Sequence, residues 1–136
     1  MFQGVLVENS SHVTVDGLQL LTGTGGGTYA PAIQVTGTSS DVTISRNDIT
    51  AFGNSSAGIE ADPSSGAGTG DVITTNYVGA GDGSGIIVDG GIGTDVTSNT
   101  VYNVCNQGIA LSGVSTGSST PSPRPTGSRP GRPGTS

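Results

Sequence analysis

A repeated segment is the feature of this sequence that most limits the folds open to it. Four related stretches start at residues 12, 41, 71 and 95, and they read HVTVDGLQL, DVTISRNDI, DVITTNYV and DVTSNTV. One aligned apolar position holds Val15, Ile44, Ile73 and Val96, and a second holds Leu20, Ile49, Val78 and Val101. Both positions recur at spacings of 29, 29 and 23 residues. Such a fixed spacing at two positions indicates consecutive copies of one structural unit.

A second set of short apolar segments alternates with the first. They cover residues 4–7, 32–35, 58–61, 85–88 and 108–111, and each begins with a small residue. Their second and fourth positions are apolar, which is the period-two pattern of a strand with one face turned inward. The third position, for example Gln34 or Glu60, is therefore expected to face solvent.

The repeat predicts a solenoid. A unit of 23 to 29 residues with short strands cannot bury its apolar face alone, whereas stacked units bury a continuous narrow core. The 25 Gly, the absence of Trp and the 31% hydrophobic content agree with a thin core. We predict an all-β fold in residues 1–113, a right-handed parallel β-helix of about four to five coils. Residues 114–136 are rich in Ser, Pro and Gly and are predicted to form a disordered tail.

Asparagine recurs three residues after the first aligned apolar position in three consecutive units. These residues are Asn47, Asn76 and Asn99, and the first unit has Leu18 in this place. Asparagine tolerates the left-handed backbone conformation at a tight bend, and stacked side chains can pass amide hydrogen bonds from coil to coil. We interpret the three asparagines as a structural ladder and not as a catalytic group.

The repeat resembles that of the pectate-lyase-like, right-handed parallel β-helix proteins. Their units run close to GI-x-V followed by VTI-x-x-N-x-I, as residues 32–49 do here, and the resemblance covers roughly residues 4–113. It implies secreted or cell-surface proteins that bind or process polysaccharides, among them lyases, hydrolases and epimerases, and also adhesins and phage tailspikes. Because one fold serves many functions, the reaction type must be argued from a site.

The resemblance implies a substrate groove along the outside of one strand stack, where the outward positions of the GI-x-V strands lie. The substrate-binding candidates at these positions are Gln34, Thr36 and Ser112, and the catalytic candidates are Glu60, Asp62 and Asp89. In the predicted register Asp62 and Asp89 lie on adjacent coils about 5 Å apart, with Glu60 about 6 to 7 Å from Asp62 along one strand.

Three neighbouring carboxylates leave three interpretations open. Like charges raise the pKa of one member, which allows one acid and one base or nucleophile, as a glycosidase requires. The trio could instead bind Ca²⁺, which prefers hard oxygen ligands. They could also be solvated surface charges. No other metal site is predicted.

β-Elimination, the lyase reaction, needs a base such as Arg, Lys, His or Tyr beside neutralising charge. Arg46 lies at the bend beside Asn47, and His12 begins an early strand. Neither residue falls on the GI-x-V face in the predicted register. We expect Arg46 to pair with Asp16 or Asp48 on the surface.

Charge and composition limit the classes of binding partner that this chain can have. Residues 1–113 contain ten acidic residues against Arg46 alone, a net charge of −9, which would repel nucleic acid and anionic lipid. The sequence contains no run of 18 apolar residues and no signal-peptide pattern at its start. The single Cys105 excludes an internal disulfide, and there is no Cys/His cluster for zinc. Since a strand pattern starts directly after Met1, we expect the chain to be the C-terminal piece of a longer protein.

The leading expectation is a secreted or cell-surface β-helix module that binds or processes polysaccharide, as an acidic-sugar lyase, hydrolase or epimerase. The alternative is a non-catalytic structural or adhesive β-solenoid, or an incomplete fragment of a larger β-helix protein. The sequence does not predict the oligomeric state.

Overall fold

The computed structural model describes residues 4–21, 30–50, 57–63 and 68–112. The predicted tail, residues 114–136, lies outside the described residues. No helix within the described ranges has the length and apolar character needed to cross a membrane. The strands are β1 Val5–Glu8, β2 Thr14–Asp16, β3 Gln19–Leu21, β4 Ile33–Gly37, β5 Thr43–Ser45, β6 Asp48–Thr50, β7 Ala57–Pro63, β8 Val72–Thr74, β9 Tyr77–Gly81, β10 Ser84–Asp89, β11 Asp95–Thr97, β12 Thr100–Val104 and β13 Ile109–Ser112.

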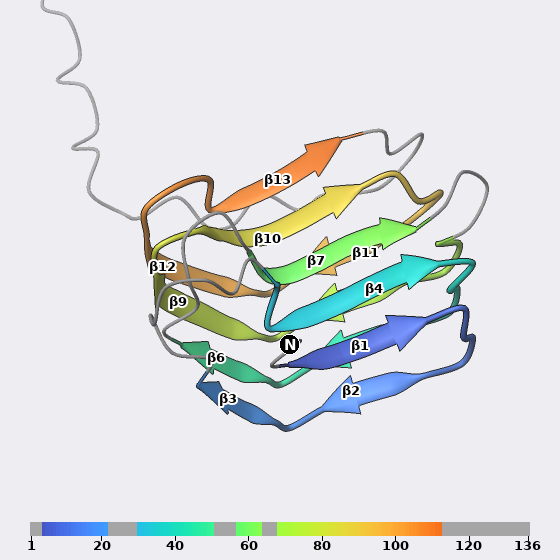
Figure 1. Cartoon of the computed structure of the whole chain (residues 1–136), viewed down its shortest axis with the longest axis horizontal. Helices are drawn as coiled ribbons and strands as arrows, with labels where there is room; N and C mark the ends of the chain where they lie inside the picture. The colour runs from blue at the N-terminus through green and yellow to red at the C-terminus, as the bar shows by residue number, and fades with distance from the viewer. Residues whose placement is uncertain (1–3, 22–29, 51–56, 64–67, 113–136) are drawn as a thin grey trace, which may run out of the picture.

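The strands form three parallel sheets, each built by stacking one strand per coil. The first sheet has the order β1-β4-β7-β10-β13, the second β2-β5-β8-β11 and the third β3-β6-β9-β12. Every pairing within them is parallel. The described strands therefore make four sets of three, and β13 adds one more strand to the first sheet (Figure 1). The predicted parallel β-helix is confirmed.

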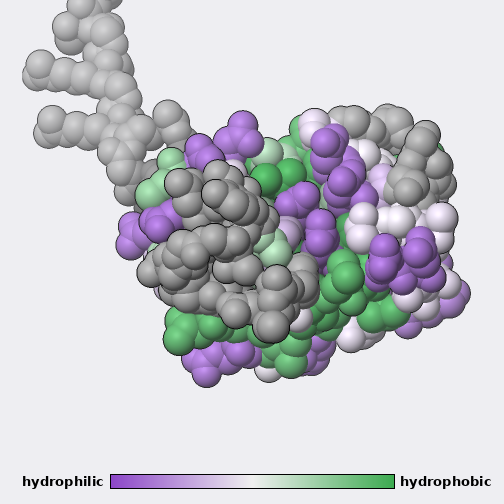
Figure 2. Space-filling view, viewed as in Figure 1, coloured by the Kyte–Doolittle hydropathy of each residue, from purple (hydrophilic) through white to green (hydrophobic). Residues whose placement is uncertain are grey.

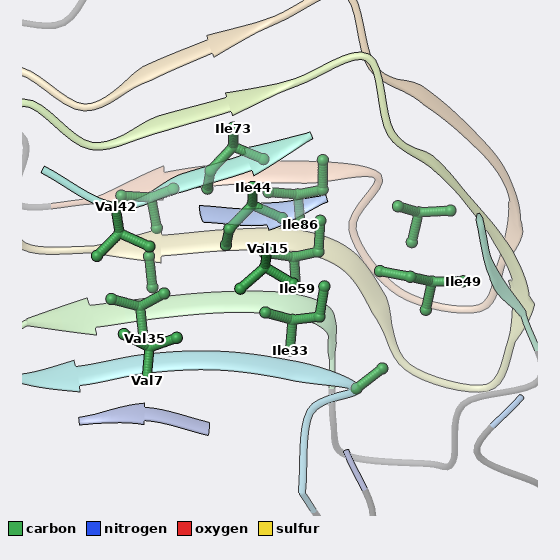
Figure 3. Close-up of a cluster of buried hydrophobic side chains, with 14 of the residues drawn as sticks. Val7, Val15, Ile33, Val35, Val42, Ile44, Ile49, Ile59, Ile73 and Ile86 are labelled. Atoms are coloured by element: carbon green, nitrogen blue, oxygen red, sulfur yellow. The ribbon is translucent and has the colours of Figure 1, made fainter. Parts of the chain in front are cut away.

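The core is a set of apolar columns inside this helix. In the first sheet Ile33, Ile59 and Ile86 stack in register, and all three are fully buried. In the second sheet Val15, Ile44 and Ile73 stack in the register that the sequence repeat predicts. Figure 3 shows these side chains pointing into the space between the sheets. Full burial of each such side chain contributes roughly 1.5–3 kcal/mol, so the stacked coils stabilise one another.

The three corners of the helix differ in how much their length varies. From the second to the third sheet the step between aligned core residues is always five positions, as from 44 to 49 and from 73 to 78. From the third to the first sheet the step varies: Leu20 and Ile33 are 13 positions apart, whereas Val78 and Ile86 are eight positions apart. The unequal coil lengths are therefore absorbed outside the corner between the second and third sheets.

The first coil carries much of the exposed apolar surface. Leu6, Leu18 and Leu21 are all exposed, Leu21 to 74%. Among the described strands, β1, β2 and β3 pair on one side only. The lower edge of Figure 2 accordingly shows hydrophobic residues at the surface.

Candidate functional site

The three asparagines of the predicted ladder lie in one buried column at the corner between the second and third sheets. Asn76 Oδ1 accepts hydrogen bonds from the backbone N–H and the side-chain Nδ2 of Asn47, both at 3.0 Å. Asn99 Oδ1 accepts the same two bonds from Asn76, at 2.9 and 3.0 Å. In the first coil the backbone N–H of Leu18 donates to Asn47 Oδ1 at 3.0 Å. The column thus joins four coils through side-chain amides.

Each ladder side chain also bonds a backbone carbonyl. The Nδ2 groups of Asn47, Asn76 and Asn99 donate to the carbonyl oxygens of Val15, Ile44 and Ile73 at 3.0, 2.9 and 2.8 Å. The left-handed backbone conformation belongs to the residue before each rung, with φ of 68° at Gly17, 52° at Arg46, 59° at Thr75 and 55° at Ser98. The expectation that asparagine itself takes this conformation is therefore wrong, and its role rests on hydrogen bonding.

Arg46 lies on the outside of the same corner, away from the first sheet. Its Nε donates to Asp16 Oδ1 at 2.8 Å, and its Nη2 contacts Asp16 Oδ2. Ser45 Oγ donates to the same carboxylate at 2.7 Å. The bonds from Arg46, helped by Ser45, lower the pKa of Asp16 to about 2. Of the two partners expected for Arg46, the structure has Asp16.

His12 is also not among the outward residues of the first sheet, because it lies between β1 and β2. It precedes β2 with φ of 59°, is exposed, and its Nδ1 lies 3.6 Å from Asp41 Oδ2. Neither His12 nor Arg46, the two bases considered for β-elimination, is therefore placed beside the candidate groove.

The outward side chains of the first sheet form two columns that run from coil to coil. The first column is Leu6, Gln34, Glu60, Ile87 and Ala110. In the second column Glu8 pairs with Thr36, Thr36 with Asp62, and Asp89 with Ser112. The fold therefore brings all six candidate residues to one outer face, which we call the acidic groove face after the substrate groove that the resemblance implies. Figure 2 views the molecule from the same side as Figure 1 and shows hydrophilic and hydrophobic residues side by side.

The charges on the acidic groove face affect one carboxyl most. Glu60 is half-buried, and this burial raises its pKa, with further increases from the negative charges of Asp62 and Asp89. Asp89 is exposed and accepts a hydrogen bond from Ser112 Oγ at 2.9 Å. Thr36 Oγ1 donates to the backbone carbonyl of Asp62 at 3.3 Å. Glu60 is thus biased toward its protonated form next to two other acidic side chains.

The carboxylates do not form a ready metal centre. Among the described residues, no group of three or more His, Cys, Asp or Glu side chains is placed to hold a metal ion. Glu60, Asp62 and Asp89 consequently do not converge on one point, as Ca²⁺ coordination would require.

One buried carboxylate was not singled out in the sequence. Asp71 is 2% exposed and stands at the inward position that Val42 has in the neighbouring coil. Its Oδ1 accepts the backbone N–H of Val42 at 2.9 Å, whereas its Oδ2 is buried with no hydrogen-bond partner in the described part of the chain. Burial raises the pKa of Asp71, and the charge of Asp41 adds to this. The 29-residue spacing could have predicted this burial, because it pairs Asp71 with the inward Val42 and not with Asp41.

An aromatic pair was also missed. Tyr77 on β9 and Tyr102 on β12 lie with ring centroids 4.6 Å apart and planes at 33°. Both point outward from the third sheet, since they alternate with the inward residues Val78 and Val101. The period-two pattern predicts the outward direction, but only the stacking of coils brings the two rings together.

The three parallel sheets, stacked coil on coil around a buried core, make this chain a three-sided parallel solenoid. The family model for the right-handed β-helix region matches residues 3–122. The chain belongs to this right-handed β-helix family, which places it among β-solenoids with a polysaccharide-related or structural role. Comparisons with curated proteins and with solved structures found no match.

Proposed function

We propose that the acidic groove face binds a polysaccharide and that Glu60, together with Asp62 and Asp89, hydrolyses its glycosidic bonds. The observation that carries this proposal is the raised pKa of Glu60 between two neighbouring carboxyl groups. A protein that acts on such polymers would work outside the cell, so the proposal includes secretion or display at the cell surface.

The chemistry needs one carboxylic acid and one carboxylate. Glu60, whose pKa is raised, is suited to protonate the glycosidic oxygen as the C–O bond breaks. Asp62 or Asp89 would take a proton from the attacking water, or attack the anomeric carbon directly. In either case water supplies the hydroxyl group of the new reducing end and one proton, which restores the acid.

Binding would extend along the columns on either side of this acid. Gln34 lies beside Glu60 in register, Thr36 beside Asp62, and Ser112 beside Asp89. Their amide and hydroxyl groups can exchange hydrogen bonds with sugar hydroxyls. Ile87, next to Glu60 in its column, can contact the C–H groups of a sugar ring.

Hydrolysis is better supported than β-elimination. Arg46 is bound to Asp16 and His12 lies beside Asp41, both at corners away from the groove. The negative charge of the groove also disfavours an acidic sugar, because like charges repel. A neutral or weakly charged polymer is therefore the substrate class that we propose.

The test is release of reducing ends from xylan, galactomannan, pectate and alginate, with unsaturated ends followed by absorbance. Glu60→Gln should lower the hydrolysis rate by roughly 100-fold or more, the usual contribution of a general acid. Asp95→Asn is the matched control, because Asp95 is an exposed acid on the second sheet. The wild-type rate should fall as pH rises through the raised pKa of Glu60.

The other outcomes decide between this proposal and its rival. If unsaturated ends formed, the reaction would be β-elimination and the proposed hydrolysis would be wrong. Binding that is lost in the Asp62→Asn/Asp89→Asn variant, without any bond cleavage, would establish a non-catalytic adhesive solenoid. If none of the four polymers is bound or cleaved, the assignment of the acidic groove face is wrong.

A further inference from the structure

The third sheet carries an aromatic pair on the side of the molecule that the proposed function does not use. Tyr77 and Tyr102 are the two tyrosines among the described residues, and both lie on its outer face. Their ring centroids are 4.6 Å apart and the planes meet at 33°. Tyr77 remains 48% exposed although its neighbour stacks against it. A large aromatic surface thus faces solvent in a chain with only 4% aromatic residues.

Gly79 makes this arrangement possible. It lies two residues after Tyr77 on β9 and opposite Tyr102 of β12. A Cβ atom at Gly79 would collide with Cε1 and Cδ1 of the Tyr102 ring and with the Tyr102 carbonyl oxygen. The ring therefore occupies the space that a side chain would take, and it lies across β9 toward Tyr77. The stacking of the two rings therefore depends on the local structure of the sheet, and the two tyrosines are not independent surface residues.

Polar groups surround the rings on the same face. Gln19, Asp48, Tyr77 and Thr100 form one outward column, and Leu21, Thr50, Gly79 and Tyr102 form the next. Partial burial raises the pKa of the Tyr102 phenol, and Tyr77 and Asp48 raise it further. A tyrosine phenol is already protonated at neutral pH, and a raised pKa does not change this, so the Tyr102 hydroxyl can donate a hydrogen bond.

We infer that this aromatic pair is a second binding site, a platform for the pyranose ring of a neutral glycan. A pyranose has a face of C–H groups and a rim of hydroxyls, which match an exposed ring with polar neighbours. The site lies on a different sheet from the acidic groove face, so this inference does not depend on the proposed function.

Other ligand classes fit the platform less well. Asp48 beside the rings and the net charge of −9 of residues 1–113, ten acidic residues against one Arg, disfavour nucleic acids and acidic sugars. The two rings stack on each other and do not face each other across a gap, so they do not enclose a cation as an aromatic cage would.

Electrophoresis of the full chain through native gels that contain hydroxyethylcellulose or galactomannan tests the inference. Both polymers should retard the wild type. Tyr77→Ala should weaken retardation about tenfold, as expected for the loss of an aromatic anchor, whereas Tyr77→Phe should retain it because the ring remains. The same roughly tenfold loss on Tyr77→Ala is expected in the Asp62→Asn/Asp89→Asn background, where the acidic groove face is disabled, and this separates the two sites.

Two results would overturn the inference: a wild type that neither polymer retards, or a Tyr77→Ala variant that is retarded as strongly as the wild type. Circular dichroism checks that Tyr77→Ala keeps its strands. Independently of that variant, titration of the wild type with mannohexaose or cellohexaose should shift the aromatic NMR resonances of Tyr77 and Tyr102. If neither oligosaccharide shifts these resonances while the gels retard the protein, the polymers bind elsewhere and the platform is refuted.

Discussion

At two corners of the helix, different side chains accept a backbone N–H from the neighbouring coil. At the corner between the second and third sheets, a left-handed residue precedes an asparagine whose Oδ1 accepts a backbone N–H from the neighbouring coil. At the corner that leads into the second sheet, the left-handed Gly70 precedes Asp71, whose Oδ1 accepts the N–H of Val42 in the same way. The first arrangement continues through three rungs, and the second has one.

The difference lies in what the other atom of the side chain can do. The Nδ2 of an asparagine donates to a carbonyl and to the next Oδ1, so every rung satisfies its neighbour. An ionised aspartate can only accept, and Asp71 Oδ2 is buried with no partner among the described residues. A hydrogen-bonded column inside a solenoid therefore needs side chains that both donate and accept.

Breaking the middle rung should have the largest effect. Asn76→Ala removes the acceptor for two groups of Asn47 and the donor to the Ile44 carbonyl. We expect the free energy of unfolding to fall by roughly 3 kcal/mol or more, because several buried groups lose their partners together. Urea denaturation followed by circular dichroism measures this. Thr100→Ala on the exposed face is the control, and a loss below about 1 kcal/mol for Asn76→Ala would contradict the ladder's role.

Placing an asparagine at the corner of Asp71, as in the ladder, should stabilise the protein. Asp71→Asn removes a buried carboxylate and puts the donor Nδ2 in the place of Oδ2, for an expected gain of about 1–2 kcal/mol at pH 7. Because the folded pKa of Asp71 is raised above 3.8, the wild type loses stability as pH rises from that value through the raised pKa. The variant should lack this loss, as unfolding curves between pH 3 and 7 can measure. A variant less stable than the wild type at pH 7 would show that the carboxylate has a partner.

Extending the ladder should have the smallest effect. Leu18→Asn places an amide in the first coil after Gly17, which already has the left-handed conformation. Because Leu18 is only 38% exposed, its replacement loses some packing, and the added bonds should make Leu18→Asn more stable than Leu18→Ala by less than about 1 kcal/mol. Comparison with Leu18→Ala isolates the amide. Equal unfolding midpoints for the two variants would mean that the column gains nothing from a fourth rung.

The sequence was sufficient for the architecture because a solenoid repeats one local pattern. Two apolar positions at a common spacing placed Val15 beside Ile44 and Leu20 beside Ile49, and the structure has both pairs. The outward positions Glu60 and Asp62 followed from the period-two pattern alone.

What the sequence did not predict depends on contacts between coils or on backbone torsion angles. The left-handed position could not be read from residue type, since Gly17, Arg46, Thr75 and Ser98 all adopt it. Asp71 is buried because it stands two residues before the inward Ile73, whereas Asp41 stands three residues before the inward Ile44. The stacking of Tyr77 on Tyr102 requires the open space above Gly79 in the neighbouring strand.

The constant five-residue step between the second and third sheets has a consequence for how such a chain can grow. Tandem duplication of a whole unit would carry its own rung and core positions, so the new coil would match its neighbours. Insertions would be accepted at the other two corners, where the step already varies: 20 leads to 33 but 78 to 86, and 35 leads to 44 but 61 to 73. Those corners are the places at which a foreign loop could be grafted or natural diversity could accumulate, while the ladder preserves the register of every coil.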